Sequence, residues 1–253
     1  MTFKEKIASG EPVLGTFVKT PHPHIVEVLA SGGLDCICLD AEHAPFDRRD
    51  LDACIMAARA NALPVLVRTT SSAAHDVLNA LDCGADGVVV PHVRSAREAR
   101  EIVASAHYGR GGDLARRGYA GSSRAAGYGT KSIAEHMAES AARTVLVAQI
   151  EDIEALDEID AIAAVEGIDV LFAGRIDLTV ALGCTSPDDE QVITAIDRIL
   201  SAAQAAGRRV GMFTPRAGDV PEWLQKGASL FLLGSDHGFI RAGAQQLRVQ
   251  AQL

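Results

Sequence analysis

Short apolar runs alternate with longer amphipathic stretches along the whole chain. Eight runs rich in aliphatic and β-branched residues predict strands that are buried on both faces. They are residues 13–17, 36–40, 64–68, 87–91, 144–151, 169–174, 209–213 and 230–235. The stretches between them have the period of amphipathic helices, as in residues 48–60, 96–106, 153–164 and 189–206. This strict alternation predicts an α/β fold, a single (β/α)8 TIM barrel over residues 1–253.

The composition agrees with a barrel and argues against a dinucleotide-binding fold. A chain of 253 residues has the usual length of a (β/α)8 barrel. Hydrophobic residues make up 48% of the chain and aromatic residues only 4%, so the core must be built mainly from Ala, Val, Leu and Ile. No glycine-rich phosphate loop follows the first predicted strand, and the glycine cluster at 109–112 follows a helix instead.

The charge balance and the apolar runs bear on partners and location. The chain has 24 basic and 33 acidic residues, a formal charge of -9, which repels nucleic acid and anionic membrane surfaces. No apolar run has the length of about 18 residues needed to span a bilayer, and residues 1–10 lack the apolar segment of a signal peptide. We therefore expect a soluble, cytoplasmic protein with no nucleic-acid or membrane partner.

The five cysteines are interpreted as small buried hydrophobic residues. They are Cys36, Cys38, Cys54, Cys83 and Cys184, and they include no C-x-x-C pair. The alternative, a thiol nucleophile, requires a nearby base, and the sequence indicates none.

Polar residues gather where predicted strands end, which is where the active site of a barrel lies. Asp40, Glu42 and His43 end the second strand, and Arg68 ends the third. Gln149 and Glu151 end the fifth strand, and the sixth is followed by Gly174-Arg175-Ile176-Asp177. The strand interiors are apolar, so these polar residues indicate a site and not an amphipathic sheet.

Two carboxylates at adjacent strand ends form a candidate metal site. Glu151 and Asp177 suit Mg²⁺ or Mn²⁺, which prefer one or two carboxylates and leave positions open for substrate oxygens. The alternative is that each acid is a solvated loop charge or a residue at a helix N-terminus.

His43 and Arg68 are the candidate catalytic residues. We expect Asp40, three residues before His43, to orient the imidazole for proton transfer, although a lone histidine is more often structural. Arg68 ends an apolar strand and needs an anionic partner, either a substrate oxygen or an internal salt bridge to Asp40 or Glu42.

Residues 107–131 are rich in Gly, Ser, Arg and Tyr and are too long for an ordinary connection. Two interpretations remain open: a lid over the site, or a solvated loop that packs on a neighbouring subunit.

Taken together, short motifs spread over nearly the whole chain resemble the HpcH/HpaI family of class II pyruvate aldolases. The motifs are Leu39-Asp40-Ala41-Glu42-His43-Ala44-Pro45, Val67-Arg68, Leu81-Asp82 with Val90-Pro91, Val147-Ala148-Gln149-Ile150-Glu151, Gly167-Ile168-Asp169, and Phe172-Ala173-Gly174 followed by Asp177-Leu178. The resemblance implies a carbon–carbon lyase that cleaves 4-hydroxy-2-oxo acids to pyruvate and an aldehyde. It also implies a divalent metal ion (Mg²⁺, Mn²⁺ or Co²⁺) in place of a Schiff-base lysine or an organic cofactor.

The resemblance also implies roles for single residues. Glu151 and Asp177 would bind the metal, and Gln149, Gly174, Ile176 and Asp177 would surround the 2-oxo acid. Arg68 would stabilise the enolate, and His43 would transfer protons with Asp40 as its partner. Asp82 matches an acid that the family presents from an adjacent subunit, which implies a homo-oligomer, a hexamer or a trimer.

The sequence departs from the family pattern at Gly174-Arg175-Ile176-Asp177, where relatives usually have proline in place of Arg175. We interpret Arg175 either as a ligand for a distal substrate carboxylate or as a solvent-facing side chain. Two other functions remain as alternatives: a lyase of the citramalyl- or malyl-CoA type, and a catalytically silent barrel that binds a 2-oxo acid.

Overall fold

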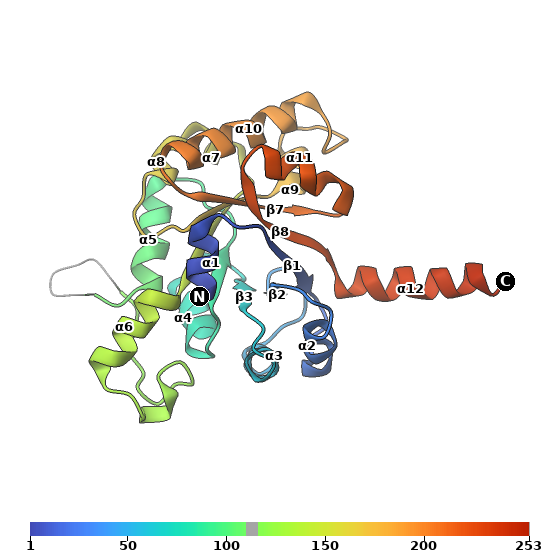
Figure 1. Cartoon of the computed structure of the whole chain (residues 1–253). Coiled ribbons are helices and arrows are strands. Elements are labelled where there is room, and N and C mark those ends of the chain that lie inside the picture. The colour runs from blue at the N-terminus through green and yellow to red at the C-terminus, as the bar shows by residue number, and fades with distance from the viewer. Residues whose placement is uncertain (110–115, 253) are drawn as a thin grey trace.

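Eight parallel strands close into a barrel in chain order, β1 to β8, in the computed structural model (Figure 1). The structure describes residues 1–109 and 116–252. The strands are β1 (Val13–Val18), β2 (Cys36–Asp40), β3 (Val65–Arg68), β4 (Gly87–Val90), β5 (Val145–Ile150), β6 (Val170–Ala173), β7 (Arg209–Thr214) and β8 (Ala228–Ser235). Each predicted strand overlaps an observed one, and β1 pairs with both β2 and β8 to close the sheet. The predicted TIM barrel is therefore confirmed.

Helices follow the strands and surround the barrel (Figure 1). They are α1 (Phe3–Ser9), α2 (Pro23–Ala30), α3 (Arg48–Ala60), α4 (Ala74–Asp82), α5 (Ala96–Ala106), α6 (Ile133–Arg143), α7 (Ile153–Asp157), α8 (Ile159–Ala163), α9 (Arg175–Ala181), α10 (Glu190–Ala205), α11 (Val220–Gln225) and α12 (Asp236–Gln250), with short 3-10 turns η1 (Gly127–Gly129) and η2 (Ala217–Asp219). The helices predicted at 48–60 and 96–106 have these bounds. The helix predicted at 153–164 is broken in two, because Glu158 has non-helical angles, φ -105 and ψ 11.

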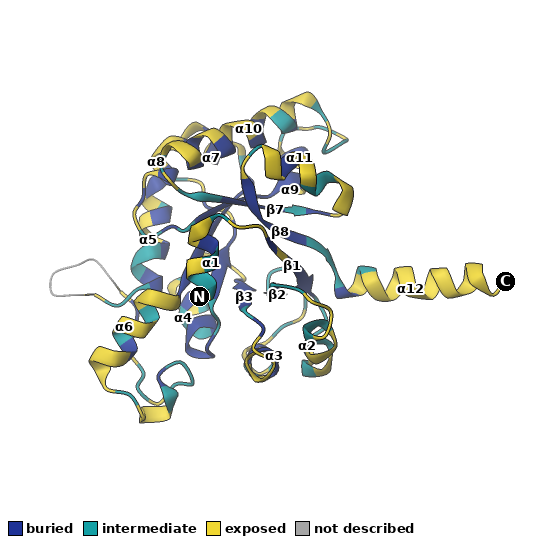
Figure 2. Ribbon diagram, in the orientation of Figure 1, coloured by how far each residue is buried: buried dark blue, intermediate teal, exposed yellow. Residues whose placement is uncertain are grey.

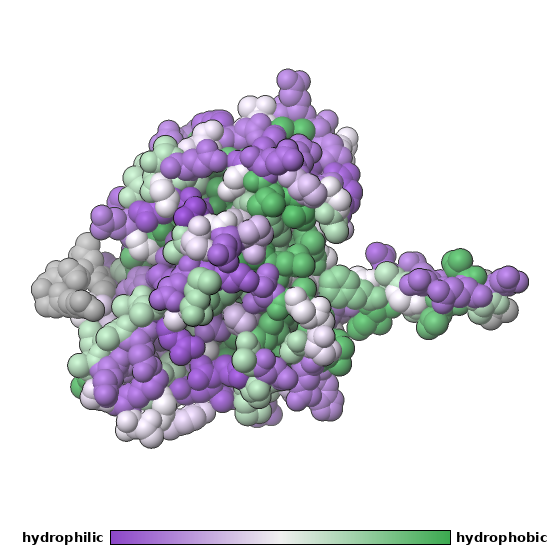
Figure 3. Space-filling model, viewed as in Figure 1, coloured by the Kyte–Doolittle hydropathy of each residue, from purple (hydrophilic) through white to green (hydrophobic). Residues whose placement is uncertain are grey.

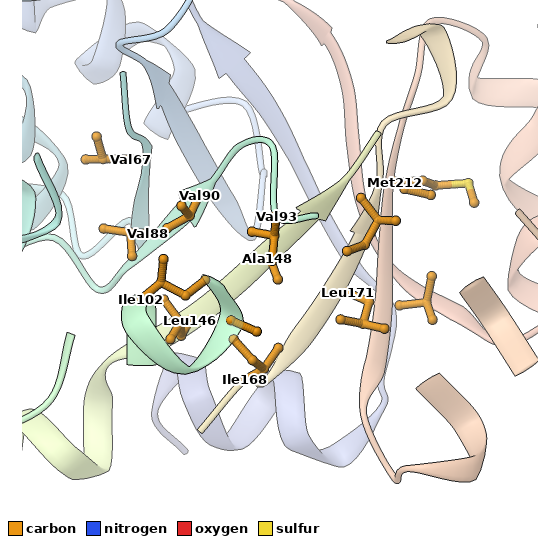
Figure 4. Packing of buried hydrophobic residues seen from close by; sticks show 14 of the residues in the cluster. Val67, Val88, Val90, Val93, Ile102, Leu146, Ala148, Ile168, Leu171 and Met212 are labelled. Carbon is orange, nitrogen blue, oxygen red and sulfur yellow. The ribbon is translucent and has the colours of Figure 1, made fainter. Parts of the chain in front are cut away.

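The core has two layers, as the pattern of continuously apolar strands requires. Side chains such as Val89 and Phe172 fill the interior of the barrel, and Ile7 of α1 joins this inner cluster. Alternate side chains such as Val88 and Val90 point outward and pack with Ile102 of α5 in the outer cluster (Figure 4). The buried strands and the exposed outer faces of the helices are seen in Figure 2. This packing holds the strand ends in fixed positions around one rim.

The described part of the long loop, residues 107–109 and 116–131, lies at the N-terminal end of the barrel. Arg116 donates its backbone N–H to Ala104 of α5, and Ala125 donates to Asp82 at the end of α4. Both helices run from the C-terminal rim down to the opposite end, so this part of the loop does not cover the chain's own C-terminal rim. The lid interpretation is wrong for these residues, and residues 110–115 lie outside the described part.

Helix α12 projects away from the barrel (Figure 1) and is exposed along most of its length (Figure 2). Its exposed hydrophobic side chains include Phe239, Ile240, Leu247 and Val249. Figure 3 shows apolar atoms along this helix beside charged ones. Among the described residues, none of the helices has the length and apolar character of a membrane span.

Candidate active site

A cavity of about 620 Å³ opens at the C-terminal rim of the barrel. Six of the predicted site residues line it: His43, Arg68, Gln149, Gly174, Ile176 and Asp177. They come from the ends of β2, β3, β5 and β6, so the barrel brings together residues that lie far apart in the sequence. Phe17, Phe172, Phe213 and Phe239 add an apolar wall. The cavity has the size and the mixed lining of a small-molecule site.

Arg68 is held rigidly at the end of β3 by the buried carboxylate of Asp40. Its Nε donates to Oδ1 at 3.0 Å and its Nη2 to Oδ2 at 2.8 Å. Burial alone would raise the pKa of Asp40, but the charge of Arg68 and hydrogen bonds from His43 and Lys19 outweigh burial and lower it. The guanidinium also lies over the Phe17 ring, 4.6 Å from its centroid. The salt bridge considered from the sequence is present, and it orients Arg68 toward the cavity that it lines.

The relation between His43 and Asp40 differs from the predicted dyad. Asp40 accepts a hydrogen bond from the backbone N–H of His43 at 3.1 Å, while its oxygens are occupied by Arg68 and by Lys19 Nζ at 3.1 Å. The carboxyl group that the His43 ring approaches is that of Glu42, with Nε2 3.8 Å from Oε2. Asp40 thus binds the backbone of His43, and no bond between its carboxylate and the imidazole is found among the described residues.

A cluster of two carboxylates and one imidazole lies at the rim beside the cavity. It consists of Glu42, His92 and Glu151, whose potential ligand atoms lie within 4.8 Å of one another. His92 Nε2 is 3.5 Å from Glu42 Oε1, and His92 Nδ1 is 3.4 Å from Glu151 Oε1. This donor set is able to hold a divalent ion.

The charge states within the cluster depend on one another. Burial raises the pKa of Glu151, and the nearby Asp177 charge adds to this effect, although bonds from the His92 backbone and Gln149 act against it. Burial alone would lower the pKa of His92, but the hydrogen bond to Asp152 and the charges of Glu151, Asp152 and Glu42 raise it. Burial makes it costly to ionise Glu151. A cation bound beside it would stabilise the charged form of this carboxylate.

Several features around Glu151 fit a bound cation. Gln149 Oε1 and Glu42 Oε2 are buried and have no hydrogen-bond partner among the described residues. Gln149 Nε2 donates to Glu151 Oε2 and fixes that carboxylate. Gly174 leaves room for Glu151, because a Cβ at this position would lie 2.6 Å from Glu151 Cβ and 2.8 Å from Oε2. Buried oxygens without partners are costly unless a ligand satisfies them.

Asp177 and Ile176 lie in the first turn of α9, which starts directly after β6. Both side chains are exposed and line the cavity. Asp177 is close enough to Glu151 for its charge to raise the pKa of that residue, yet it lies outside the Glu42, His92 and Glu151 cluster. Its role as a metal ligand, which the sequence predicts together with Glu151, stays a prediction.

Arg175 is buried and lines the cavity, so the solvent-facing interpretation was wrong, and its role as a ligand for a distal substrate carboxylate stays a prediction. It is 3% exposed, and its Nε donates to the carbonyl of Pro187 at 3.0 Å. Its other nitrogens bind Asp188 and Asp219. The side chain therefore tethers the start of α9 to the segments after α9 and β7. Sequence alone could not show these partners, which come from distant loops.

Asp82 is not brought to the cavity of its own chain. It lies at the C-terminal end of α4, near the N-terminal end of the barrel, and pairs with Arg117 at 3.4 Å. Burial raises its pKa despite the Arg117 charge. The prediction that Asp82 serves an adjacent subunit stays a prediction.

Lys19 and His92 belong to the site but were not predicted, and Glu42 was predicted only as a polar strand-end residue and a possible partner of Arg68. Lys19 follows β1, Glu42 follows β2 and His92 follows β4, so the strand-end rule points to each of them. Lys19 lines the cavity as an ion-pair partner of Asp40. All five cysteines are free, none lines the cavity, and burial raises the pKa of each, which disfavours a thiolate nucleophile.

Comparison with known proteins decides the family. The model of the HpcH/HpaI aldolase/citrate lyase family matches residues 14–242. The chain belongs to this family. The relatives that match nearly the whole chain are named aldolases, which are carbon–carbon lyases, so the activity predicted from the sequence is confirmed at this level.

Full-length relatives agree with this assignment. A 5-keto-4-deoxy-D-glucarate aldolase from Shigella boydii is 34% identical over 249 residues, which cover 97% of this chain and 94% of that protein. The crystal structure of an HpcH/HpaI aldolase/citrate lyase family protein from Burkholderia cenocepacia has a TM-score of 0.93 at 29% identity, covering 99% of this chain and 98% of that one. The HpcH/HpaI aldolase from Desulfitobacterium hafniense has a TM-score of 0.91 at 30% identity, covering 100% and 98%. This HpcH/HpaI protein is an aldolase-type carbon–carbon lyase of a metal-dependent class.

Proposed function

We propose that this HpcH/HpaI protein catalyses the reversible cleavage of a 4-hydroxy-2-oxo acid into pyruvate, or a related 2-oxo acid, and an aldehyde. The observation that carries the proposal is the position of the buried Glu151 carboxylate. It lies beside a cavity that also presents the fixed guanidinium of Arg68 and the imidazole of His43. The aldolase names of full-length relatives support this reaction over the CoA-thioester alternative.

A divalent ion fits this site, and we propose Mg²⁺, Mn²⁺ or Co²⁺. Glu151 and Asp177 would hold it, because they come from adjacent strand ends and their charges already interact. When bound, such an ion supplies Lewis-acid polarisation of the 2-oxo carbonyl. The buried Oε1 of Gln149, which has no hydrogen-bond partner within the described part of the chain, supports a site built for a further group.

Arg68 stabilises the negative charge that develops on the substrate carbonyl oxygen during cleavage. Its two bonds to Asp40 and its contact with Phe17 set the plane of the guanidinium before substrate arrives. Donors that are fixed in advance need no reorganisation in the transition state, which is where they act. Gln149, held by Glu151, and the backbone after Gly174 line the part of the cavity where the acid end of the substrate would lie.

His43 transfers the proton of the 4-hydroxyl group. Its ring is half exposed and lines the cavity, and its backbone is fixed by Asp40. In cleavage, the imidazole removes the hydroxyl proton while the C3–C4 bond breaks and the aldehyde leaves. In the reverse direction it returns the proton to the new alkoxide.

We also propose that the chain works as a homo-oligomer, a hexamer or a trimer. The exposed hydrophobic side chains of α12, which include Leu247 and Val249, support this, because such residues on a projecting helix are typical of an interface (Figure 3). Light scattering coupled to size-exclusion chromatography measures the assembly. A monomer at micromolar concentration would contradict the proposal.

Deuterium exchange at the methyl group of pyruvate, followed by NMR, tests the reaction without knowledge of the aldehyde. We expect exchange in protein loaded with Mg²⁺, Mn²⁺ or Co²⁺ and none after the metal is removed. The Arg59→Lys variant, altered at the opposite end of the barrel, should exchange like the unaltered protein. Folded protein that binds pyruvate but shows no exchange with any of these ions would instead be the silent barrel considered from the sequence.

A further inference from the structure

His92 occupies an unusual backbone conformation at the rim. It lies two residues after the end of β4, behind Pro91, and has a φ of 55°, in the left-handed region that few residues other than glycine adopt. This conformation directs its backbone N–H to Glu151 Oε1 at 2.9 Å. The same turn brings the imidazole to Glu151, so both the backbone and the ring of His92 face the buried carboxylate. Strained backbone conformations occur often at functional sites, so the contact between His92 and Glu151 indicates a function for His92.

The two ring nitrogens of His92 have different surroundings. Nδ1 lies 3.0 Å from Asp152 Oδ2, and Asp152 is itself held by Arg94 Nε at 3.2 Å. Nε2 lies 3.5 Å from Glu42 Oε1, while the Glu151 carboxylate lies on the other side of the ring, with its Oε1 3.4 Å from Nδ1. Histidines that bind metals usually donate their other ring N–H to a carboxylate, which fixes the tautomer and the orientation of the ring. His92, Asp152 and Arg94 form such an arrangement.

Glu42 provides a second, independent observation. Its side chain is 10% exposed, and its Oε2 has no hydrogen-bond partner among the described residues. Glu42 therefore faces the His92 ring with Oε1, while its Oε2 lies 3.3 Å from Arg68 Nε as an ion-pair partner. Among the described residues, Gln149 Oε1 is a buried oxygen beside Glu151 with no hydrogen-bond partner. A bound cation between Glu42, His92 and Glu151 would offset the cost of burying these two carboxylates together.

We propose that His92 binds the divalent ion through Nε2, as a nitrogen ligand that joins Glu42 and Glu151 at the metal site. This inference rests on the proposed function, because it concerns the same ion. It adds an imidazole to Glu151, which the sequence predicts as a metal ligand together with Asp177; Glu42 was not predicted as a ligand. Imidazole favours Co²⁺, Ni²⁺ and Zn²⁺ more than it favours Mg²⁺, so His92 biases this site toward the former ions.

Pulsed EPR of Mn²⁺-loaded protein tests for the nitrogen ligand directly. A nitrogen bound to Mn²⁺ gives a hyperfine coupling that carboxylate and water ligands do not give. We expect this coupling in the unaltered protein, its loss in His92→Gln, and its retention in His75→Gln, where the altered histidine is exposed and pairs with Asp76. Circular dichroism of each variant establishes that it is folded.

Calorimetric titration of metal-stripped protein with Co²⁺ and Mg²⁺ gives the second readout. Altering a group that only supports a ligand already costs about 10- to 100-fold in metal affinity. We expect His92→Gln to lose more than about 10-fold in Co²⁺ affinity, with a smaller loss for Mg²⁺. Should His92→Gln fail to fold, Asp152→Asn keeps the ring and should weaken Co²⁺ binding while the nitrogen coupling remains.

The outcomes separate this inference from the proposed function. Metal binding and pyruvate exchange without a nitrogen coupling would overturn the role of His92 and leave the aldolase proposal standing. Equal Co²⁺ affinity in His92→Gln and the unaltered protein would also overturn it. No metal binding by folded, unaltered protein would contradict both proposals.

Discussion

The guanidinium of Arg68 and the carboxylate of Asp40 form a bidentate pair at the ends of β3 and β2, with distances of 3.0 and 2.8 Å. The two residues are register partners in the sheet, so the backbone ladder itself sets their separation. Both are buried. The pair is therefore a fixed part of the barrel rim, and its Arg68 member lines the cavity.

Arg68→Lys should abolish most of the activity while it keeps the charge. A lysine ammonium is a point charge and cannot form the planar bidentate pair with Asp40, so the donor is no longer fixed before reaction. We expect the rate of pyruvate exchange to fall about 100-fold or more, the usual cost of losing one fixed donor to a developing oxyanion. The matched control is Arg97→Lys on the exposed face of α5, which should exchange normally. A rate within a few-fold of normal in Arg68→Lys would remove this role.

Asp40→Asn should lower stability in a manner that depends on pH. The pKa of Asp40 in the folded protein lies below its ordinary value of 3.8. A carboxyl group with a lowered folded pKa contributes stability above the unfolded value, and this contribution is lost as the pH falls through the folded pKa. At pH 7 we expect a loss of about 3 kcal/mol, because the substitution leaves Arg68 buried without its main partner.

Urea unfolding of both proteins between pH 3 and pH 8 measures this difference. It should be constant near neutral pH and should shrink below about pH 4. A difference that stays the same down to pH 3 would show that the Asp40 charge does not stabilise the fold.

His43→Gln should separate metal binding from cleavage. The ring is half exposed, lies 3.8 Å from Glu42 and is not part of the Glu42, His92 and Glu151 cluster, so its loss should remove no metal ligand. General acid–base catalysis contributes about 100- to 10,000-fold, and we expect cleavage to slow within that range. Calorimetry for Mn²⁺ affinity and a coupled assay for pyruvate release give the two readouts. Normal turnover would assign the proton transfer to another group.

The fold and most of the cavity lining follow from the sequence because both depend on strand order. Continuous apolar runs locate the strands, and the first polar residue after each run lies at the rim by geometry alone. Asp40, Arg68, Glu151 and Asp177 were found in this way. Lys19 and His92 obey the same rule, but a single polar residue after a strand is a weak signal without its partners.

The partners of charged side chains could not be predicted, because they come from segments that are distant in sequence. Asp40 accepts a hydrogen bond from the backbone N–H of His43 and pairs with Arg68, and it does not form the predicted contact with the His43 ring. Arg175 binds Asp188 and Asp219, which the pattern of hydrophobic positions does not bring near it. Hydrophobic periodicity determines where an element lies, whereas the choice of ion-pair partner depends on side-chain geometry across loops.

Gly174→Ala should weaken metal binding through the carboxylate that it contacts. A Cβ here would lie 2.8 Å from Glu151 Oε2 and 2.6 Å from Glu151 Cβ, so Glu151 must move. We expect at least a 10-fold loss of Mn²⁺ affinity, comparable to the loss of a group that supports a ligand. Gly218→Ala is the matched control, because no atom lies within 4 Å of its added Cβ. Equal Mn²⁺ affinity in the two variants would show that Glu151 is not held by this contact.

Arg175→Met should affect stability and not the binding of the 2-oxo acid. The guanidinium is buried, donates to the Pro187 carbonyl at 3.0 Å and lies 5.5 Å from the centroid of the Trp223 ring. Its acidic partners Asp188 and Asp219 keep a cation after the change, because Arg216 pairs with both. We expect a loss of about 1–3 kcal/mol from the partly buried Pro187 carbonyl that loses its donor and from the other lost bonds.

Thermal unfolding and the KM for pyruvate exchange distinguish the two roles of Arg175. A structural role predicts a Tm lowered by several degrees with an unchanged KM, since a loss of 1 kcal/mol shifts the Tm of a chain of this size by about 2–4 °C. Arg216→Met, at an exposed position of the same network, should lower the Tm less. A raised KM with an unchanged Tm would instead mean that Arg175 binds substrate. Its ion pairs with Asp188 and Asp219 would then form only when no substrate is bound.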